Sequence, residues 1–353
     1  MTNLKTISSL VSFYMVELQK HKSTINFKQL DSHFHEDGNH HKPTACDKRD
    51  SQLGLGMTSI SDLEEESLQY IKNDVQAIVC EVLDVDKTYL YMHYDRELEA
   101  IHLIEIGNKI TRYKRGEPLA HILGYKYFWN QKLKVTVDTL IPRADTEVLV
   151  QTVLDDIFHS NCCYKGKGLP SLTTQLIPSY DRGEGVELSI LDLGTGTGAI
   201  ALALAGELPN TKIVAVDYCV KALEVASENA ISNSISNVEF LQSHWYKNLE
   251  GRKFDVIVSN PPYIDRDDND IDAEVKVHEP ASALFADNSG LADIEVIISQ
   301  AEAFLIKNGS LYIEHGYNQS REVQEIFAKY GFESTETIRD LNSKDRCTRA
   351  TKK

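Results

Sequence analysis

The feature that most constrains the fold is an alternation of short apolar strands and helical segments after residue 186. Strands are expected at seven stretches: 188–193, 212–216, 238–242, 254–259, 310–314, 335–339 and 347–351. Alternation of this kind indicates a mostly parallel sheet with helices on both faces. The sequence therefore predicts a Rossmann-like α/β fold, in which ligands bind at the carboxyl ends of the strands.

A glycine-rich segment follows the first of these strands. It reads Gly194-Thr195-Gly196-Thr197-Gly198 and opens an apolar helix. Glycines at this place let the backbone approach a ligand closely. Asp217 ends the next strand, where a carboxylate can accept both hydroxyls of a ribose. Because Gly194, Gly196 and Ala199 also match the dinucleotide fingerprint, a nicotinamide site, an S-adenosylmethionine site and a structural turn are all still open.

The segment Asn260-Pro261-Pro262-Tyr263 distinguishes these alternatives. It directly follows the apolar strand 254–259, so it is expected at the same edge of the sheet. Two prolines fix two φ angles and leave free carbonyls in a rigid loop. The Asn260 side-chain oxygen and the Pro261 carbonyl can each accept one N–H of a planar amide or amine, while Tyr263 stacks on the planar group. Positioning then provides most of the catalysis, and S-adenosylmethionine provides the methyl group.

The chain of 353 residues is long enough for two domains. Apolar residues recur at helical spacing between Ser61 and Arg115, which indicates a helical domain over residues 1–120. A β-hairpin linker is expected over 121–140 and the catalytic domain over 141–353. Polar stretches at 31–57 and 159–187 are interpreted as a mobile insertion and a surface insertion. The histidines of the first match no structural zinc spacing, so no metal is expected.

The charge and the apolar pattern limit the partners. A formal net charge of -16 disfavours a protein that neutralises many phosphates, so no direct nucleic-acid contact is expected. No apolar stretch reaches the length of a membrane span. Neither a secretory leader nor a disulfide framework is recognised, so we expect a cytoplasmic protein without membrane contact.

Several segments together resemble the HemK/PrmC family, the protein-(glutamine-N5) methyltransferases that modify peptide chain release factors. The similarity runs from about Ser67 to Ala350 and is carried by these segments: 115–124, Leu140–Glu147, Gly194–Gly198, Asp217, Asn260–Tyr263, Glu279-Pro280 with Ala283-Leu284, and Glu314-His315-Gly316.

The resemblance implies a class I S-adenosylmethionine-dependent fold and methylation of the glutamine in the Gly-Gly-Gln tip of a release factor. Cofactor contacts carried over by position are Gly194, Thr195, Gly196, Thr197, Gly198, Asp217, Trp245 and Asn260. The substrate glutamine is assigned to Asn260, Pro261, Pro262 and Tyr263. The helical domain is assigned to docking of the release factor, and the enzyme is expected to act as a monomer.

The sequence alone leaves some interpretations open. Trp245 can flank the adenine or belong to the core, and Arg143 and Glu147 can connect the domains or cap a helix. Because His315 is not needed for the chemistry, it is interpreted as a strand-end residue. An N6-adenine methyltransferase of DNA or RNA is the main alternative function, since adenine presents the same planar nitrogen. A nicotinamide-dependent dehydrogenase and a regulator that binds S-adenosylmethionine without turnover are more distant alternatives.

Overall fold

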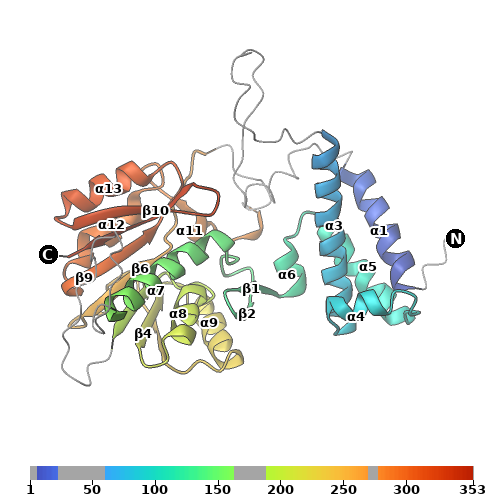
Figure 1. Ribbon diagram of the computed structural model, residues 1–353, viewed down its shortest axis with the longest axis horizontal. Coiled ribbons are helices and arrows are strands. Elements are labelled where there is room, and N and C mark those ends of the chain that lie inside the picture. The colour runs from blue at the N-terminus through green and yellow to red at the C-terminus, as the bar shows by residue number, and fades with distance from the viewer. Residues whose placement is uncertain (1–5, 23–59, 163–187, 269–276, 353) are drawn as a thin grey trace, which may run out of the picture. The chain divides into compact units, whose positions relative to one another are not determined.

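The computed structural model describes residues 6–22, 60–162, 188–268 and 277–352 (Figure 1). The polar stretch 31–57 lies outside these residues, and so does the part of the stretch 159–187 that begins at residue 163. The chain divides into two compact units, Met1–Leu123 and Gly124–Lys353. None of the described helices is long and apolar enough to cross a membrane.

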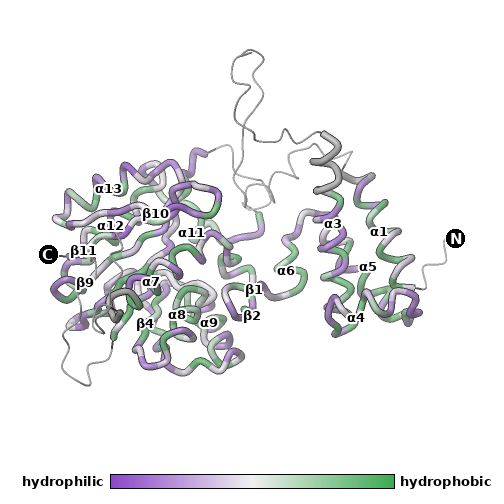
Figure 2. The backbone as a smooth tube through the Cα atoms, in the orientation of Figure 1, coloured by the Kyte–Doolittle hydropathy of each residue, from purple (hydrophilic) through white to green (hydrophobic). Residues whose placement is uncertain are grey.

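The first unit consists of helices around one apolar core. Its helices are α1 (Ile7–Lys22), α3 (Ile60–Leu83), α4 (Lys87–Met92), α5 (Ala100–Lys114) and α6 (Leu119–Leu123). Apolar and polar residues alternate along α3 in Figure 2, as expected for a helix with one buried face. The apolar run that begins at Ile7 forms α1, and Ile7 and Leu10 pack in the same core as Ile71 and Val75 of α3.

The second unit is built on a seven-stranded sheet in the order β10-β11-β9-β6-β3-β4-β5. Its strands are β3 (Ser189–Leu193), β4 (Lys212–Asp217), β5 (Val238–Gln242), β6 (Phe254–Ser259), β9 (Leu305–Glu314), β10 (Glu333–Arg339) and β11 (Asp345–Thr351). In this sheet β11 pairs antiparallel with both β10 and β9, and the remaining neighbouring strands pair parallel. The expected α/β sheet is therefore confirmed, although β9 begins at Leu305 and not at residue 310. Asn308, at a φ of 65°, interrupts the apolar pattern inside that strand.

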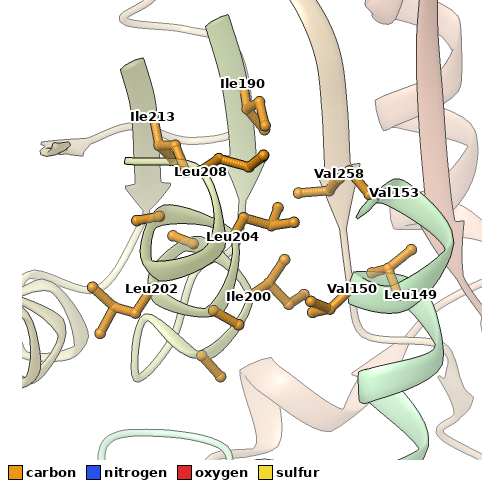
Figure 3. Close-up of a cluster of buried hydrophobic side chains, with 14 of the residues drawn as sticks. Leu149, Val150, Val153, Ile190, Ile200, Leu202, Leu204, Leu208, Ile213 and Val258 are labelled. Carbon is orange, nitrogen blue, oxygen red and sulfur yellow. The ribbon is translucent and has the colours of Figure 1, made fainter. Parts of the chain in front are cut away.

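Helices cover both faces of this sheet. They are α7 (Glu147–Cys162), α8 (Ala199–Glu207), α9 (Val220–Ser232), α12 (Ala292–Ala301) and α13 (Ser320–Lys329), with the short α11 (Ala281–Leu284) before α12. Side chains of α7 and α8 meet those of β3, β4 and β6 in one apolar cluster (Figure 3). The second cluster contains residues of α12 and α13. Ile190 belongs to the first cluster and Leu191 to the second, because successive strand residues point to opposite faces.

Two smaller strand pairs complete this unit. They are the hairpin of β1 (Tyr125–Phe128) and β2 (Gln131–Lys134), and the parallel pair of β7 (Ile264–Asp265) and β8 (Phe285–Ala286). The hairpin packs on the catalytic sheet, since Phe128 and Leu133 are buried in the same apolar cluster as residues of α7 and α8. Gln131 Nε2 also donates a hydrogen bond to the Leu202 carbonyl at 2.7 Å. The hairpin is thus part of the second unit.

Candidate active site

The order in which the chain adds strands to the sheet reverses between β3 and β6. From β3 the chain order runs outward through β4 and β5, whereas β6 and β9 lie on the other side. Open α/β sheets bind ligands at such a switch point, beyond the carboxyl ends of the strands. Leu193 and Ser259 are paired in register as the last residues of β3 and β6. Gly194 and Asn260 follow these two residues, so the glycine segment and the Asn260–Tyr263 loop begin side by side.

The glycine segment needs its glycines for backbone conformation. Gly194, Gly196 and Gly198 have φ angles of 75°, 54° and 84°, a region that other residues rarely adopt. A Cβ built on Gly196 would meet nothing within 4 Å, so that side of the loop faces open space. Thr195 and Thr197 are buried instead. The segment thus combines a half-buried backbone, which is open on one side of Gly196, with buried threonine side chains.

The buried carboxylate of Asp192 in β3 anchors this segment. Thr195 Oγ1 donates a hydrogen bond to Asp192 Oδ2 at 2.6 Å. Burial raises the pKa of Asp192 to about 7, and the hydrogen bond from Thr195 opposes that rise. Asp192 therefore ties the loop to the strand that precedes it.

Asp217 fastens the glycine segment from the neighbouring strand. Its Oδ2 accepts the backbone N–H of Gly196 at 2.9 Å, and its Oδ1 accepts that of Cys219 at 2.8 Å. Burial raises the pKa of Asp217, and these backbone hydrogen bonds lower it. The structure therefore brings Asp217 and the glycine segment together, as the sequence suggested for a cofactor site.

Asn229 of α9 connects the glycine segment to the hairpin. Its Nδ2 donates to the carbonyls of Thr197 at 2.9 Å and Lys134 at 3.1 Å, and its Oδ1 accepts the Lys134 N–H at 2.6 Å. The side chain is 1% exposed. Sequence reasoning did not single out this residue, because its partners come from segments far apart in the chain.

Trp245 lies beside the first glycine of the segment. A Cβ built on Gly194 would lie 3.5 Å from Trp245 Cζ3. The indole is half-buried against the core and lies beside the Asp293 side chain. Burial raises the pKa of Asp293, and the neighbouring Trp245 side chain lowers it. Trp245 therefore combines the two positions considered from the sequence, because it borders both the core and the glycine loop.

The Asn260–Tyr263 loop carries two hydrogen-bond acceptors that are not used within the described chain. Asn260 Nδ2 donates to Thr146 Oγ1 at 3.1 Å, while its Oδ1 accepts no hydrogen bond from the residues that the structure describes. The same holds for the Pro261 carbonyl among the described hydrogen bonds. Pro261 is buried and Pro262 is half-buried, so the backbone of this loop is held firmly. Such an arrangement can bind an N–H₂ group.

Tyr263 is fixed by Glu314, the last residue of β9. The phenol donates a hydrogen bond to Glu314 Oε1 at 3.3 Å. Burial raises the pKa of Glu314 to about 7, and hydrogen bonding with the Thr146 side chain lowers it. Burial, and then the charge of Glu314, raise the pKa of Tyr263, so the phenol stays neutral. Two hydrogen-bonded pairs, Asn260 with Thr146 and Tyr263 with Glu314, thus hold this loop.

The segment Leu140–Glu147 is tied to this site by charged groups. Arg143 donates to Glu279 Oε1 at 2.5 Å, and Glu279 Oε2 accepts the backbone N–H of Ile141 at 2.9 Å. Asp145 pairs with Arg346 at 2.7 Å. Glu147 Oε1 accepts the backbone N–H of Trp129 in the hairpin turn at 2.8 Å. Arg143 and Glu147 therefore connect loops within the second unit.

His315 takes no part in the two pairs that hold the Asn260–Tyr263 loop. Its Nδ1 lies 2.9 Å from the Gly316 carbonyl and its Nε2 2.8 Å from Thr348 Oγ1. Burial lowers the pKa of the imidazole. Since a carbonyl can only accept, Nδ1 carries the proton and Nε2 accepts from Thr348. This geometry agrees with a strand-end residue.

Sequence reasoning missed two residues that support the Asn260–Tyr263 loop. Gln319 Nε2 donates to the Tyr263 carbonyl at 2.9 Å, and Gly290 packs against the same carbonyl. Gln319 stands four residues after His315, close to a quoted motif. Nothing in the sequence pattern indicates which carbonyl it meets.

Two family models match the chain. Residues 59–124 match the PrmC N-terminal domain, and residues 172–292 match the Methyltransferase small domain. A solved structure, the hMettl16 catalytic domain in complex with MAT2A 3'UTR hairpin 6, resembles this chain with a TM-score of 0.46 and 13% identity. That likeness covers 72% of this chain and 84% of the other.

Curated relatives resemble the chain over most of their length. The release factor glutamine methyltransferase of Francisella tularensis is 54% identical over 79% of this chain and 90% of its own. The release factor glutamine methyltransferase of Vibrio cholerae is 39% identical over 78% of this chain and 87% of its own. The chain belongs to the family of release factor glutamine methyltransferases, with S-adenosylmethionine as its methyl donor.

Proposed function

We propose that this chain transfers a methyl group from S-adenosylmethionine to the side-chain amide nitrogen of the glutamine in the Gly-Gly-Gln tip of a peptide chain release factor. The observation that carries the proposal is the pair of acceptors in one rigid loop, Asn260 Oδ1 and the Pro261 carbonyl. A primary amide has two N–H groups and needs two such acceptors. Family membership selects the release factor as the source of that amide.

The chemical difficulty lies in the acceptor nitrogen. Its lone pair is delocalised into the amide carbonyl, so the nitrogen is a weak nucleophile. Asn260 Oδ1 and the Pro261 carbonyl accept its two N–H groups, which orients the nitrogen toward the methyl group and partly recovers its lone pair from delocalisation into the carbonyl. S-adenosylmethionine supplies a methyl group on a positively charged sulfur when it is bound. The nitrogen then carries excess positive charge, which the two oxygen dipoles stabilise until one proton leaves to water.

Tyr263 supports this binding as an aromatic surface. Its phenol is held by Glu314 and stays neutral, so it is unsuited to remove a proton. The ring can stack on the planar amide while its backbone carbonyl stays fixed by Gln319. In this proposal Pro262 keeps the loop rigid, and no conventional base acts before the attack.

We assign cofactor binding to the segment Gly194–Gly198, Asp217 and Trp245, with Asn260 close to the methyl donor. The open side of Gly196 leaves room for a ligand beside the backbone. Asp217 stands at the strand end where ribose hydroxyls are usually bound. Trp245 borders the same loop and can flank an adenine. These observations support a nucleoside-containing cofactor at the carboxyl edge of β3 and β4.

The proposal extends to the partner and the setting of the reaction. Residues 1–120 dock the release factor, the hairpin at 121–140 precedes the catalytic domain, and residues 141–353 perform the transfer. The enzyme works as a monomer in the cytoplasm and makes no direct contact with nucleic acid. The match of residues 59–124 to the PrmC N-terminal domain supports this division.

Transfer of labelled methyl tests the proposal. Purified protein is incubated with labelled S-adenosylmethionine and a release factor, beside a release factor whose tip glutamine is replaced by alanine. We expect label in the first release factor and none in the second. Duplex DNA and ribosomal RNA serve as competing substrates, and label in either of them instead of the release factor would overturn the assignment in favour of an N6-adenine methyltransferase.

A further inference from the structure

The peptide unit between Thr197 and Gly198 can point in two directions. Gly198 has a φ of 84°, and glycine adopts negative φ angles about as readily, so this residue does not by itself resist a flip of the preceding peptide. The observed direction closes a turn, in which the Gly198 N–H donates to the Thr195 carbonyl at 2.8 Å. Gly196, whose open side leaves room for a ligand, lies within this turn. The shape of the candidate cofactor surface therefore depends on which way the peptide points.

Asn229 of α9 holds the carbonyl end of this peptide. Its Nδ2 donates to the Thr197 carbonyl oxygen at 2.9 Å, and both residues are buried. Helix α9 also packs on the glycine itself, because a Cβ built on Gly198 would lie 3.2 Å from the Cβ of Ala226. Ala226 and Asn229 are three residues apart and therefore lie on one face of the helix. That face of α9 supports the end of the glycine segment.

The hairpin fixes the orientation of the Asn229 amide. Strand β2 pairs with β1 along one edge, and at its other edge the Lys134 N–H donates to Asn229 Oδ1 at 2.6 Å. The Lys134 carbonyl accepts from Asn229 Nδ2 at 3.1 Å. An exchange of the two amide ends would place the oxygen against two carbonyls and the NH₂ group against an N–H. Backbone groups alone therefore hold this amide in one orientation.

Other contacts keep the hairpin beside α9. Asn233, directly after this helix, donates to the Lys132 carbonyl at 3.1 Å. Lys134 Nζ pairs with Glu228 Oε2 at 2.5 Å. Buried side chains of the hairpin also pack in the apolar cluster that contains α8. The hairpin is therefore expected to stay in place when the side-chain contacts of Asn229 alone are removed.

We propose that Asn229 is a positioning residue for the cofactor, which holds the Thr197–Gly198 peptide in the direction that binds S-adenosylmethionine and takes its own orientation from the edge of β2. The inference rests on the proposed function, because there the segment Gly194–Gly198 binds the cofactor. A preformed loop binds a ligand more tightly than a loop that must be ordered on binding. Asn229 therefore acts on the affinity for the cofactor without touching it.

The first experiment measures Kd for S-adenosylmethionine by calorimetry in the full chain with Asn229→Ala. Alanine removes the donor to the Thr197 carbonyl and is compatible with the helix. We expect Kd to rise about tenfold, which is the scale of one lost hydrogen bond. With cofactor and release factor both saturating, the transfer rate should fall by less than about threefold, since the bound cofactor then holds the loop. The variant thus separates an effect on KM for the cofactor from an effect on kcat.

Asn237→Ala is a matched control for a loss of stability. The Asn237 side chain also donates to backbone carbonyls, among them those of Leu208 and Thr211 at 3.1 Å. Its own carbonyl accepts the Ile213 N–H at 3.1 Å near the start of β4, so it lies at the opposite edge of the sheet from the glycine segment. Both variants should lower the midpoint of urea unfolding. Only Asn229→Ala should raise Kd, and Asn237→Ala should leave it within about twofold.

A second control separates the glycine segment from the hairpin. Asn233→Ala removes the donor to the Lys132 carbonyl and leaves the Asn229 side chain in place. Kd for S-adenosylmethionine should again stay within about twofold of wild type. Thermal unfolding shows whether each variant folds. Asn229→Ser, whose side chain is one bond shorter than that of asparagine, replaces the alanine variant if that one does not.

The outcomes separate this inference from the proposed function. Calorimetry needs no release factor, so a wild type that binds S-adenosylmethionine but methylates no release factor contradicts the proposed function and leaves the test of Asn229 valid. The positioning role is overturned if Asn229→Ala keeps Kd within threefold of wild type, or if either control raises Kd as much. A fall in kcat as large as the rise in Kd would also overturn it, because the effect would not be confined to cofactor affinity.

Discussion

The side-chain amide of Gln319 holds the backbone of Tyr263, with Gln319 Nε2 at 2.9 Å from the Tyr263 carbonyl oxygen. The same NH₂ group donates to the Ser289 carbonyl at 3.1 Å, and Gln319 Oε1 accepts the Gly316 N–H at 2.8 Å. One amide thus joins the loop after β6, the turn before α12 and the turn after β9. The position of the Asn260–Tyr263 loop depends on this junction.

Gln319→Glu is expected to weaken both the fold and the reaction. It replaces a donor by a carboxylate that faces the part-buried Tyr263 carbonyl and the exposed Ser289 carbonyl. Leaving a buried carbonyl unpaired costs about 1–3 kcal/mol. We expect the free energy of unfolding in urea to fall by that amount and kcat to fall about tenfold or more. Gln300→Glu, an exposed site on α12, makes the same charge change and should leave both near wild type. Wild-type kcat in Gln319→Glu would contradict the role of the junction.

Gly290→Ala tests how closely the backbone approaches Tyr263. A Cβ at Gly290 would lie 2.0 Å from the Tyr263 carbonyl oxygen, and the φ of Gly290 is +80°. Gly331, at a φ of +78°, has nothing within 4 Å of such a Cβ and is the matched control. Gly331→Ala should cost about 1–2 kcal/mol of unfolding free energy from backbone strain alone. Gly290→Ala should cost roughly 1–3 kcal/mol more and reduce kcat. Equal losses in the two variants would mean that the close approach is unimportant.

The stability of the fold should depend on pH through Glu314. Burial raises its pKa from 4.5 in the unfolded chain to about 7. Its contribution is therefore fully present below pH 4.5 and is lost as the pH rises through 7, by about 3 kcal/mol at 1.36 kcal/mol per pKa unit. Glu314→Gln removes this loss, so its stability relative to wild type should increase between pH 5 and pH 8 in urea unfolding. The exposed Glu250→Gln serves as control, and a pH-independent difference for Glu314→Gln would argue against a raised pKa.

Asp217→Asn is expected to weaken cofactor binding. The amide would place an NH₂ group against the backbone N–H of Gly196 or of Cys219, both of which need an acceptor. Loss of a hydrogen bond to a charged group costs about 1.5–3 kcal/mol, so Kd for S-adenosylmethionine should rise roughly tenfold to a hundredfold by calorimetry. Glu224→Gln on the exposed side of α9 should leave Kd unchanged. An unaltered Kd in Asp217→Asn would remove this residue from the cofactor site.

The sequence was sufficient to predict the parallel sheet and the edge of the sheet at which the candidate site lies. The run Phe254–Ser259 contains Phe254, Val256, Ile257 and Val258, which indicates a parallel strand covered on both faces. The polar segments that follow such strands are expected at one edge of the sheet. The supporting residues were not predictable in this way. Thr146 and Asn260 are 114 residues apart in sequence, and Gln319 meets Tyr263 from 56 residues away. Hydrogen bonds over such separations depend on the packing of α7 and α13, for which the local pattern gives no signal.

Asn260→Ala tests whether Asn260 holds the acceptor amide, through its methyl-transfer rate at saturating S-adenosylmethionine with a release factor as acceptor. We expect transfer to fall at least a hundredfold, because an acceptor of the amide N–H is lost at the reacting nitrogen. Kd for S-adenosylmethionine, measured by calorimetry on the same sample, should change by less than about threefold. Transfer that persists within tenfold of wild type, or a loss that follows the loss of cofactor binding, would contradict the claim that Asn260 holds the acceptor amide.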